Sequence, residues 1–396
     1  MRCPRGRGAQ WGNAQGPPKG TTGGRAMSWR KQKALQIHQA LTSDPIDIDA
    51  LRNAAVSEGG LLSQEIRRKV WPKLLNVSVL SLPPKPGPSI RCNHRDFNQV
   101  EMDVRRSLRR FPAGMPDAER SVLQEQLTDM ILYVLQSHPE LNYYQGYHDI
   151  AVTLLLTVGP RLGTAMLSSL STHHLRDFME RTMDPTKHML NYLMPVIRCE
   201  SVQLHDFMLR SEVGYIFALS WLITWYGHVL SNYHQVLRLY DFFLASHPLM
   251  PVYCAAQMVL MREQEVLRGD CDMPSVHQLL SNIPKDFPFE TLVCRTHGLF
   301  QRRPPAQLVT QASLHKYKSV SIASFHSLLH SSSSQRPDFV LRRQADPEPG
   351  ALAPPRSQNR LVKLAVWGLS ASLGAAALAV TQSALEWGPE ILLGLF

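Results

Sequence analysis

The chain has 396 residues, a net charge of +10 at pH 7 and 44% hydrophobic residues, enough for a sizeable core. The excess charge does not indicate a nucleic-acid-binding face, because eight basic residues precede the first acidic residue, Asp44. The six cysteines have no Cys-x-x-Cys spacing and the histidines no paired ligand spacing. We therefore predict reduced thiols and no metal site.

Composition and apolar periodicity divide residues 1–300 into three parts. Residues 1–27 are rich in Gly, Pro and Arg, which predicts a disordered basic tail. Residues 28–56 predict a basic helical lead-in, and 57–300 an all-helical domain. The first core helix of that domain is expected over 61–75.

A helix with one apolar stripe is predicted over 97–111, ended by Pro112. Arg106 falls nearly opposite the centre of the stripe, so its side chain should point away from the core. Glu101 and Arg105 are spaced to pair on the flank of the helix. The stripe consists of Phe97, Val100, Val104, Leu108 and Phe111.

Two further core helices are predicted over 118–137 and from Tyr147 to 159. The loop between them contains Gln145 and Gly146, and glycine permits backbone geometry that other residues resist. Gln145 is therefore expected in a loop between two buried helices.

The remaining apolar periodicity is helical, and no convincing alternating strand appears, so the fold class is all-α. The uncharged segment 215–230 is too short for a membrane span and contains Trp221, Trp225 and His228, which favours a buried core helix. Helices are predicted over 165–181, 191–210, 213–230, 236–245 and 252–267.

The C-terminal region predicts a linker over 301–360 and then a membrane span. Residues 364–380 carry no charge, and adding 381–385 reaches the ~20 residues that a bilayer core requires. A transmembrane tail anchor is therefore predicted over 361–386, with a short lumenal tail over 387–396. The alternative is a C-terminal core helix.

Three features bear on the predicted anchor. Trp367 and Trp387 lie near its ends, as interfacial tryptophans do. Its small residues at spacing four could support weak homo-association through the span. Its Ala-rich, moderate hydropathy suggests the endoplasmic reticulum membrane, with the mitochondrial outer membrane left open.

Residues 66–75, 100–107 and 143–146 form three short motifs that follow one another along the chain. In this order they resemble the motifs of the TBC domain, the GTPase-activating domain for Rab proteins. Residues 100–107, Val-Glu-Met-Asp-Val-Arg-Arg-Ser, resemble its arginine motif, Ile-x-x-Asp-x-x-Arg followed by Thr or Ser. Residues 143–146, Tyr-Tyr-Gln-Gly, match its glutamine motif, and 66–75 resemble an earlier signature with Arg67 and Trp71. The resemblance covers roughly 59–248. Tyr147-His148-Asp149 stand where many members carry Met-Asn, a departure that could bear on partner choice.

The resemblance implies that Arg106 and Gln145 are catalytic fingers inserted in trans into the partner's active site. Motif spacing selects Arg106 over the adjacent Arg105. Asp103 could steer Arg106 through an i,i+3 contact, and Tyr143 should pack beneath the glutamine loop beside Gly146. Arg67 and Trp71 should hold the first helix in the core.

The predicted function is therefore a GTPase-activating protein for Rab proteins. The chain has no Gly-x-x-x-x-Gly-Lys-Ser/Thr loop, so no cofactor of its own is expected, and the partner should carry GTP and Mg²⁺.

An endoplasmic reticulum anchor, with the domain facing the cytosol, implies Rabs of early secretory traffic; a Golgi location is also open. The alternative is a scaffold of the same fold that binds a Rab without accelerating hydrolysis. A nucleic-acid binder would need interleaved aromatics or a recognised module.

Overall fold

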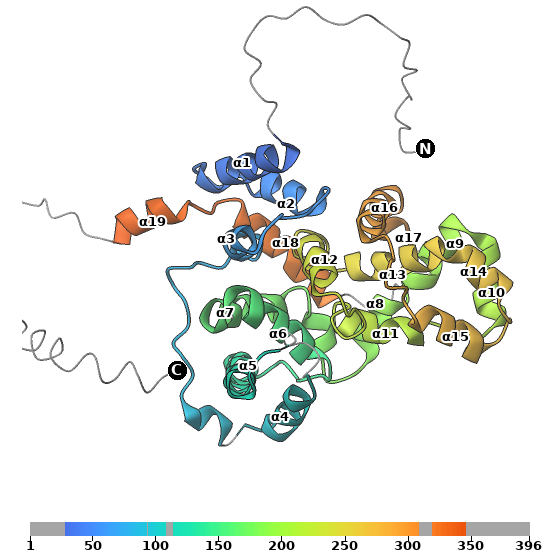
Figure 1. Ribbon diagram of the computed structural model, residues 1–396, viewed down its shortest axis with the longest axis horizontal. Helices are drawn as coiled ribbons and strands as arrows, with labels where there is room; N and C mark the ends of the chain where they lie inside the picture. The colour runs from blue at the N-terminus through green and yellow to red at the C-terminus, as the bar shows by residue number, and fades with distance from the viewer. Residues whose placement is uncertain (1–27, 93, 108–113, 309–318, 346–396) are drawn as a thin grey trace, which may run out of the picture. The chain divides into compact units, whose positions relative to one another are not determined.

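Helices build the described part of this chain, which comprises residues 28–92, 94–107, 114–308 and 319–345 of a computed structural model (Figure 1). No strand occurs within these residues, so the all-α prediction is confirmed for them. The described residues from Ser28 to Arg342 belong to one compact unit. The predicted N-terminal tail, 1–27, and the predicted anchor and lumenal tail lie outside the described residues.

The first half of the body places the arginine-bearing helix on a bundle of longer helices. α4 packs on α5, and α5, α6 and α7 pack on one another (Figure 1). The predicted helix over 118–137 is confirmed by α5. The helices are α1 (Trp29–Thr42), α2 (Ile48–Val56), α3 (Gln64–Leu74), η1 (Pro88–Arg91), α4 (Phe97–Arg106), α5 (Asp117–Ser137), α6 (Tyr147–Val158) and α7 (Pro160–Thr172).

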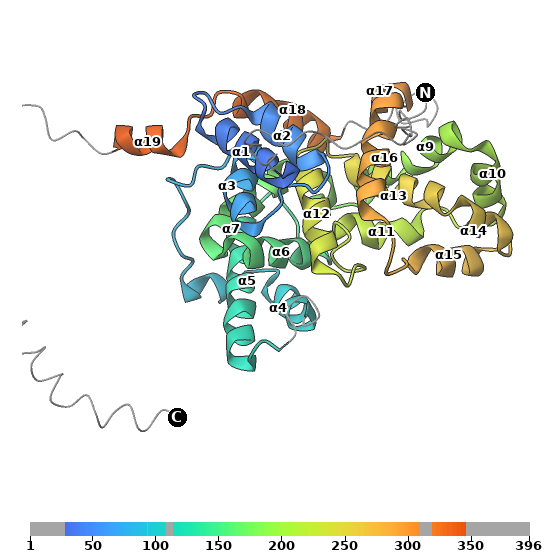
Figure 2. The same ribbon diagram turned by 45° about the horizontal axis from the view of Figure 1, so that its top comes forward.

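The second half is built around α13, whose residues from Met250 to Val259 are all buried. It packs against α9 and α16, and the turned view separates this group from α4 and α5 (Figure 2). The helices are η3 (Arg176–Met179), α8 (Asp184–Leu190), α9 (Leu193–Glu200), α10 (Val202–Arg210), α11 (Ile216–Ile223), α12 (Tyr233–Leu244), α13 (Met250–Met261), α14 (Glu263–Arg268), α15 (Met273–Ser281), α16 (Phe289–Arg302) and α17 (Pro305–Leu308).

Several predicted helices have different bounds in the structure. The helix predicted over 97–111 is described only as far as Ser107, and the segment 252–267 is divided between α13 and α14. The segment 165–181 is replaced by α7, which begins at Pro160, because proline suits the first position of a helix. The segment 191–210 is broken at Ser201, whose hydroxyl accepts from the amide of Leu204 at 3.1 Å and so starts α10. The segment 213–230 stops being helical after Ile223, where the chain turns sharply.

The predicted linker over 301–360 differs from the structure, because α18 (Val320–Ser332) and α19 (Asp338–Ala345) form there. Phe325 and Leu328 of α18 are buried. The run of serines suggested a linker. In the structure their hydroxyls donate to carbonyl oxygens of the preceding turn, as Ser332 Oγ does to Leu329 O at 2.9 Å. A polar composition is therefore compatible with a helix end that packs on the body.

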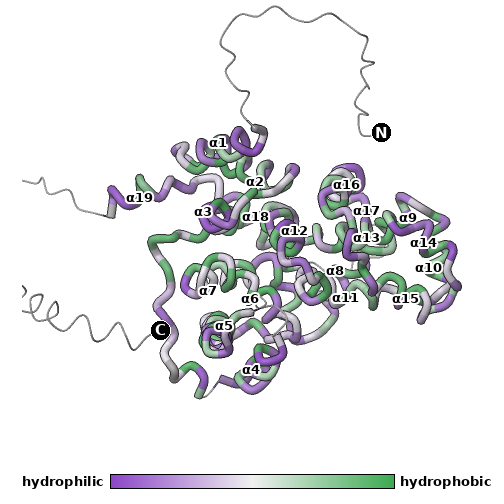
Figure 3. The backbone as a smooth tube through the Cα atoms, in the orientation of Figure 1, coloured by the Kyte–Doolittle hydropathy of each residue, from purple (hydrophilic) through white to green (hydrophobic). Residues whose placement is uncertain are grey.

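Most of the described helices carry both hydrophobic and hydrophilic residues (Figure 3). Within the described residues, no helix combines the length and apolar character needed to cross a bilayer. For the segment 215–230, Trp221 and Trp225 are buried in the core, in agreement with the core assignment.

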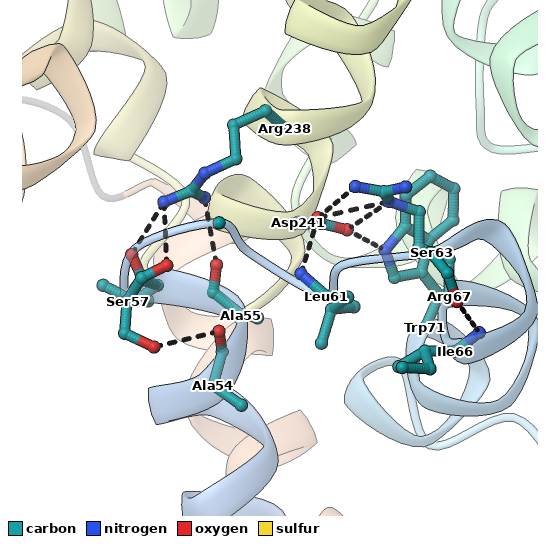
Figure 4. Close-up of polar contacts among 12 residues, drawn as sticks. Ala54, Ala55, Ser57, Leu61, Ser63, Ile66, Arg67, Trp71, Arg238 and Asp241 are labelled. Carbon is teal, nitrogen blue, oxygen red and sulfur yellow. Dashed lines mark hydrogen bonds and ion pairs between the residues drawn. The ribbon is translucent and has the colours of Figure 1, made fainter. Parts of the chain in front are cut away.

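The first core helix is held by a buried carboxylate on α12 (Figure 4). Asp241 accepts from Arg67 Nε at 2.9 Å and Nη2 at 2.8 Å, and from Trp71 Nε1 at 2.8 Å. It also accepts from the amide of Leu61 at 3.0 Å. Arg67 and Trp71 therefore hold α3 against α12. From the same helix, Arg238 reaches three carbonyls at the end of α2 and the turn that follows it.

Candidate functional site

α4 presents Arg106 to solvent by burying the opposite side of the helix. Val100 and Val104 are at most 1% exposed, whereas Arg106 is exposed. Its neighbour Arg105 pairs with Glu101 at 2.8 Å on the helix surface, at the predicted spacing. The helix therefore directs Arg106 outward, as the sequence predicts, and leaves Arg105 in a surface ion pair.

The loop before α6 presents Gln145, which is exposed, beside the buried Gly146. Gly146 has φ +109°, a conformation that side-chain-bearing residues rarely adopt. A Cβ at this position would lie 2.9 Å from Thr224 Cγ2. The glycine is needed both for the turn and for the close approach of α11.

One hydrogen bond connects the two finger-bearing elements. Tyr143 OH donates to Asp103 Oδ2 at 2.9 Å, and the Asp103 side chain is buried. Burial, with the Asp103 charge adding to it, raises the pKa of Tyr143, so the phenol stays a neutral donor. Tyr143 OH also lies 3.3 Å from His148 Nδ1. The contact that we expected from Asp103 to Arg106 stays a prediction.

Arg106 and Gln145 line the same cavity, whose volume is about 320 Å³. It is surrounded by residues of α4, of the loop that contains Gln145, of α6, and of α11 with the turn that follows it. Within the described residues, no cluster of His, Cys, Asp or Glu side chains could hold a metal ion. The lining residues are Asp103, Arg106, Ser107, Gln145, Gly146, His148, Asp149, Ser220, Ile223, Thr224 and His228.

Sequence reasoning missed the side of the cavity formed by α11 and the turn after it. Ser220, Ile223, Thr224 and His228 come from a segment that we assigned only to the core. They carry no motif, and their approach to Gly146 depends on long-range packing. The departure at 147–149 was the one local signal, since His148 and Asp149 line the cavity beside them.

The cavity combines a cationic guanidinium with a neutral carboxamide at its open side. Arg106 offers a planar set of donors that suits phosphate oxygens. Gln145 can both donate and accept hydrogen bonds. Such a pair can stabilise anionic charge and orient water.

Residues 64–267 match the family Rab-GTPase-TBC domain, which is just over half of the chain. The chain belongs to this family. TBC1 domain family member 20 of Homo sapiens is 59% identical over 375 residues, 93% of each chain. The Bos taurus protein of the same name is 55% identical over 404 residues, 100% of this chain and 99% of its own length.

A more distant relative and a solved structure are also similar to this chain. The GTPase-activating protein gyp10 of Schizosaccharomyces pombe is 33% identical over 282 residues, 70% of this chain and 74% of its own length. The crystal structure of the Ypt/Rab-GAP domain of Gyp1p superposes with a TM-score of 0.56 at 15% identity. It covers 70% of this chain and 99% of that domain, and it shows that the fold is shared.

Proposed function

We propose that this TBC-family protein accelerates GTP hydrolysis by Rab GTPases of the early secretory pathway, and that Arg106 and Gln145 act in trans. The observation that carries the proposal is that both side chains are exposed and line one cavity. The family assignment implies Rab partners, and the gyp10 relative is named a GTPase-activating protein.

In this mechanism Arg106 supplies positive charge to the γ-phosphate as negative charge develops on it. An arginine supplied in trans contributes about 10³ to 10⁵ in rate, roughly 4 to 7 kcal/mol. Gln145 orients the attacking water through its carboxamide. Catalysis then rests on positioning and electrostatics, and no covalent intermediate forms on this chain.

Asp103 and Tyr143 are positioning residues in this proposal. Their hydrogen bond joins α4 to the glutamine loop, one turn before Arg106 and two residues before Gln145. Both side chains are largely withdrawn from solvent, so the bond fixes the spacing of the two fingers. GTP and Mg²⁺ arrive with the partner.

The location of this activity is the cytosolic face of the endoplasmic reticulum membrane in our proposal. The support is the uncharged run over 364–380 within the predicted anchor, 361–386. Carbonate extraction of cell membranes tests whether this segment anchors the chain in a membrane. The full chain should stay with the membrane pellet and a chain ending at residue 360 should be released; release of both would contradict the anchor.

Single-turnover GTP hydrolysis by a panel of Rabs, with the full chain in detergent, tests the activity. We expect one or a few Rabs to be accelerated, and Arg106→Ala or Gln145→Ala to reduce the acceleration by about 10² or more. Arg105→Ala is the matched control, since its side chain pairs with Glu101, and should retain activity. Binding without acceleration of any Rab would indicate the scaffold function instead.

A further inference from the structure

One face of α11 leads out of the cavity onto the surface. Ser220 and Ile223 line the cavity. Ile216 lies on the same face, one helical turn before Ser220, and is 60% exposed. Leu219, between them, is partly buried. A strip whose apolar members are Ile223, Leu219 and Ile216 therefore extends from the cavity along α11.

The turn after α11 is held in an unfavourable backbone conformation. Trp225 and Tyr226 have φ of 45° and 63°, and the left-handed region costs roughly 1–2 kcal/mol for each such residue. Both side chains are at most 1% exposed. Trp225 packs edge-on against Tyr240 and Phe243, with centroids 5.3 and 5.5 Å away. The core thus holds this turn in one geometry.

The turn brings His228 back to the cavity. Its Nδ1 lies 3.5 Å from Asp149 Oδ2; the His228 side chain is 70% exposed and the Asp149 side chain 3% exposed. The amide of His228 donates to Thr224 Oγ1 at 3.3 Å, and Thr224 lies against Gly146. A buried carboxylate therefore orients an exposed imidazole at the rim.

We propose that Ile216, Ile223 and His228, together called the α11 wall, recognise the GTPase whose nucleotide the fingers reach. The proposal rests on the proposed function. A partner that delivers its γ-phosphate to Arg106 and Gln145 must cover the cavity rim, and so also the adjoining strip. Apolar anchors beside an oriented polar group are typical of interface sites that determine affinity. The wall binds the partner, and the fingers carry out the chemistry.

Steady-state kinetics of the full chain with an accelerated Rab test this division of roles. Ile216→Asp and His228→Ala should each raise KM about five- to tenfold or more, with kcat within about twofold of the wild type. His228→Gln keeps a hydrogen-bonding side chain and should recover most of the loss. Val202→Asp on α10 is the control, because Val202 is 59% exposed but does not line the cavity.

Three outcomes would overturn the proposal. They are an unchanged KM in both wall variants, a loss of kcat at constant KM, and an equal effect of Val202→Asp. If the wild-type chain accelerates no Rab, the proposed function fails separately. Affinity for GTP-loaded Rabs then decides the role of the wall, and equal Kd values for the wild type and Ile216→Asp would overturn it.

Discussion

Asp241 is the residue on which the first core helix depends. Its side chain is fully buried, and its carboxylate accepts bonds from Arg67, Trp71 and the amide of Leu61 (Figure 4). Arg67 lies 174 residues away in the chain, and its side chain is 10% exposed. Since a buried charge needs a partner, removing either member leaves the other uncompensated.

Asp241→Asn should lower the free energy of unfolding by about 3–5 kcal/mol, because Arg67 would stay buried without its counter-charge. Urea unfolding at pH 7 measures it. Glu101→Gln breaks the pair with Arg105, whose members are 37% and 72% exposed, and should cost less than about 0.5 kcal/mol. Equal losses in the two variants would contradict the role assigned to Asp241.

α18 is held on the body by hydrogen bonds at its N-terminus and by ring contacts of Phe325. Asp177 Oδ1 accepts from the amide of Val320 at 2.9 Å, and Asp177 Oδ2 accepts from the Ser319 hydroxyl. Phe325 packs edge-on against His174, with centroids 5.0 Å apart, and lies near His247. Burial lowers the pKa of His174 to about 3 and that of His247 to about 4.

The lowered pKa values of His174 and His247 predict that the folded state loses stability in acid. A histidine whose pKa is lowered by folding takes up its proton first in the unfolded state, so stability is lost as pH falls below about 6.5. From pH 7 to pH 5, His174 should remove about 2 kcal/mol, and His174→Gln should lack that loss. Urea unfolding of both chains at the two pH values measures the difference. Parallel losses would show that His174 does not contribute.

At the scale of the whole body, the segment after α18 returns to the N-terminal helices. Gln335 O accepts from the amide of Ile46 at 2.9 Å, and Gln335 Nε2 donates to Lys73 O at 2.7 Å. Arg336 pairs with Asp44 at 2.6 Å. Residues 319–338 therefore belong to the folded body, although the family match ends at residue 267.

A chain ending at residue 304 should consequently be less stable than one ending at residue 345. Loss of Phe325 and Leu328 alone removes two buried side chains, each contributing about 1.5–3 kcal/mol. We expect a lower unfolding midpoint in urea and faster proteolysis of the shorter chain. Equal midpoints would mean that α18 adds nothing to the body.

Much of the candidate site was predictable because its signals are local. The stripe of α4 set the outward direction of Arg106, and the glycine after Gln145 marked the turn into α6. The helix ends were less accessible, since Ser201 interrupts an apolar run by a side-chain cap. A serine can be recognised as a helix cap only when the structure of the chain before and after it is known.

Helical periodicity predicts the all-α class and the outward direction of Arg106. The resemblance of short motifs to the TBC family singles out Gln145 and assigns Arg67 and Trp71 to the core. All of these signals lie within a few turns of the chain. Only the tertiary structure decided that Asp241 partners Arg67, that α18 packs on the body, and that His228 joins the cavity. Burial and ion pairing depend on segments far apart in the chain, and short-range patterns do not specify which of them meet.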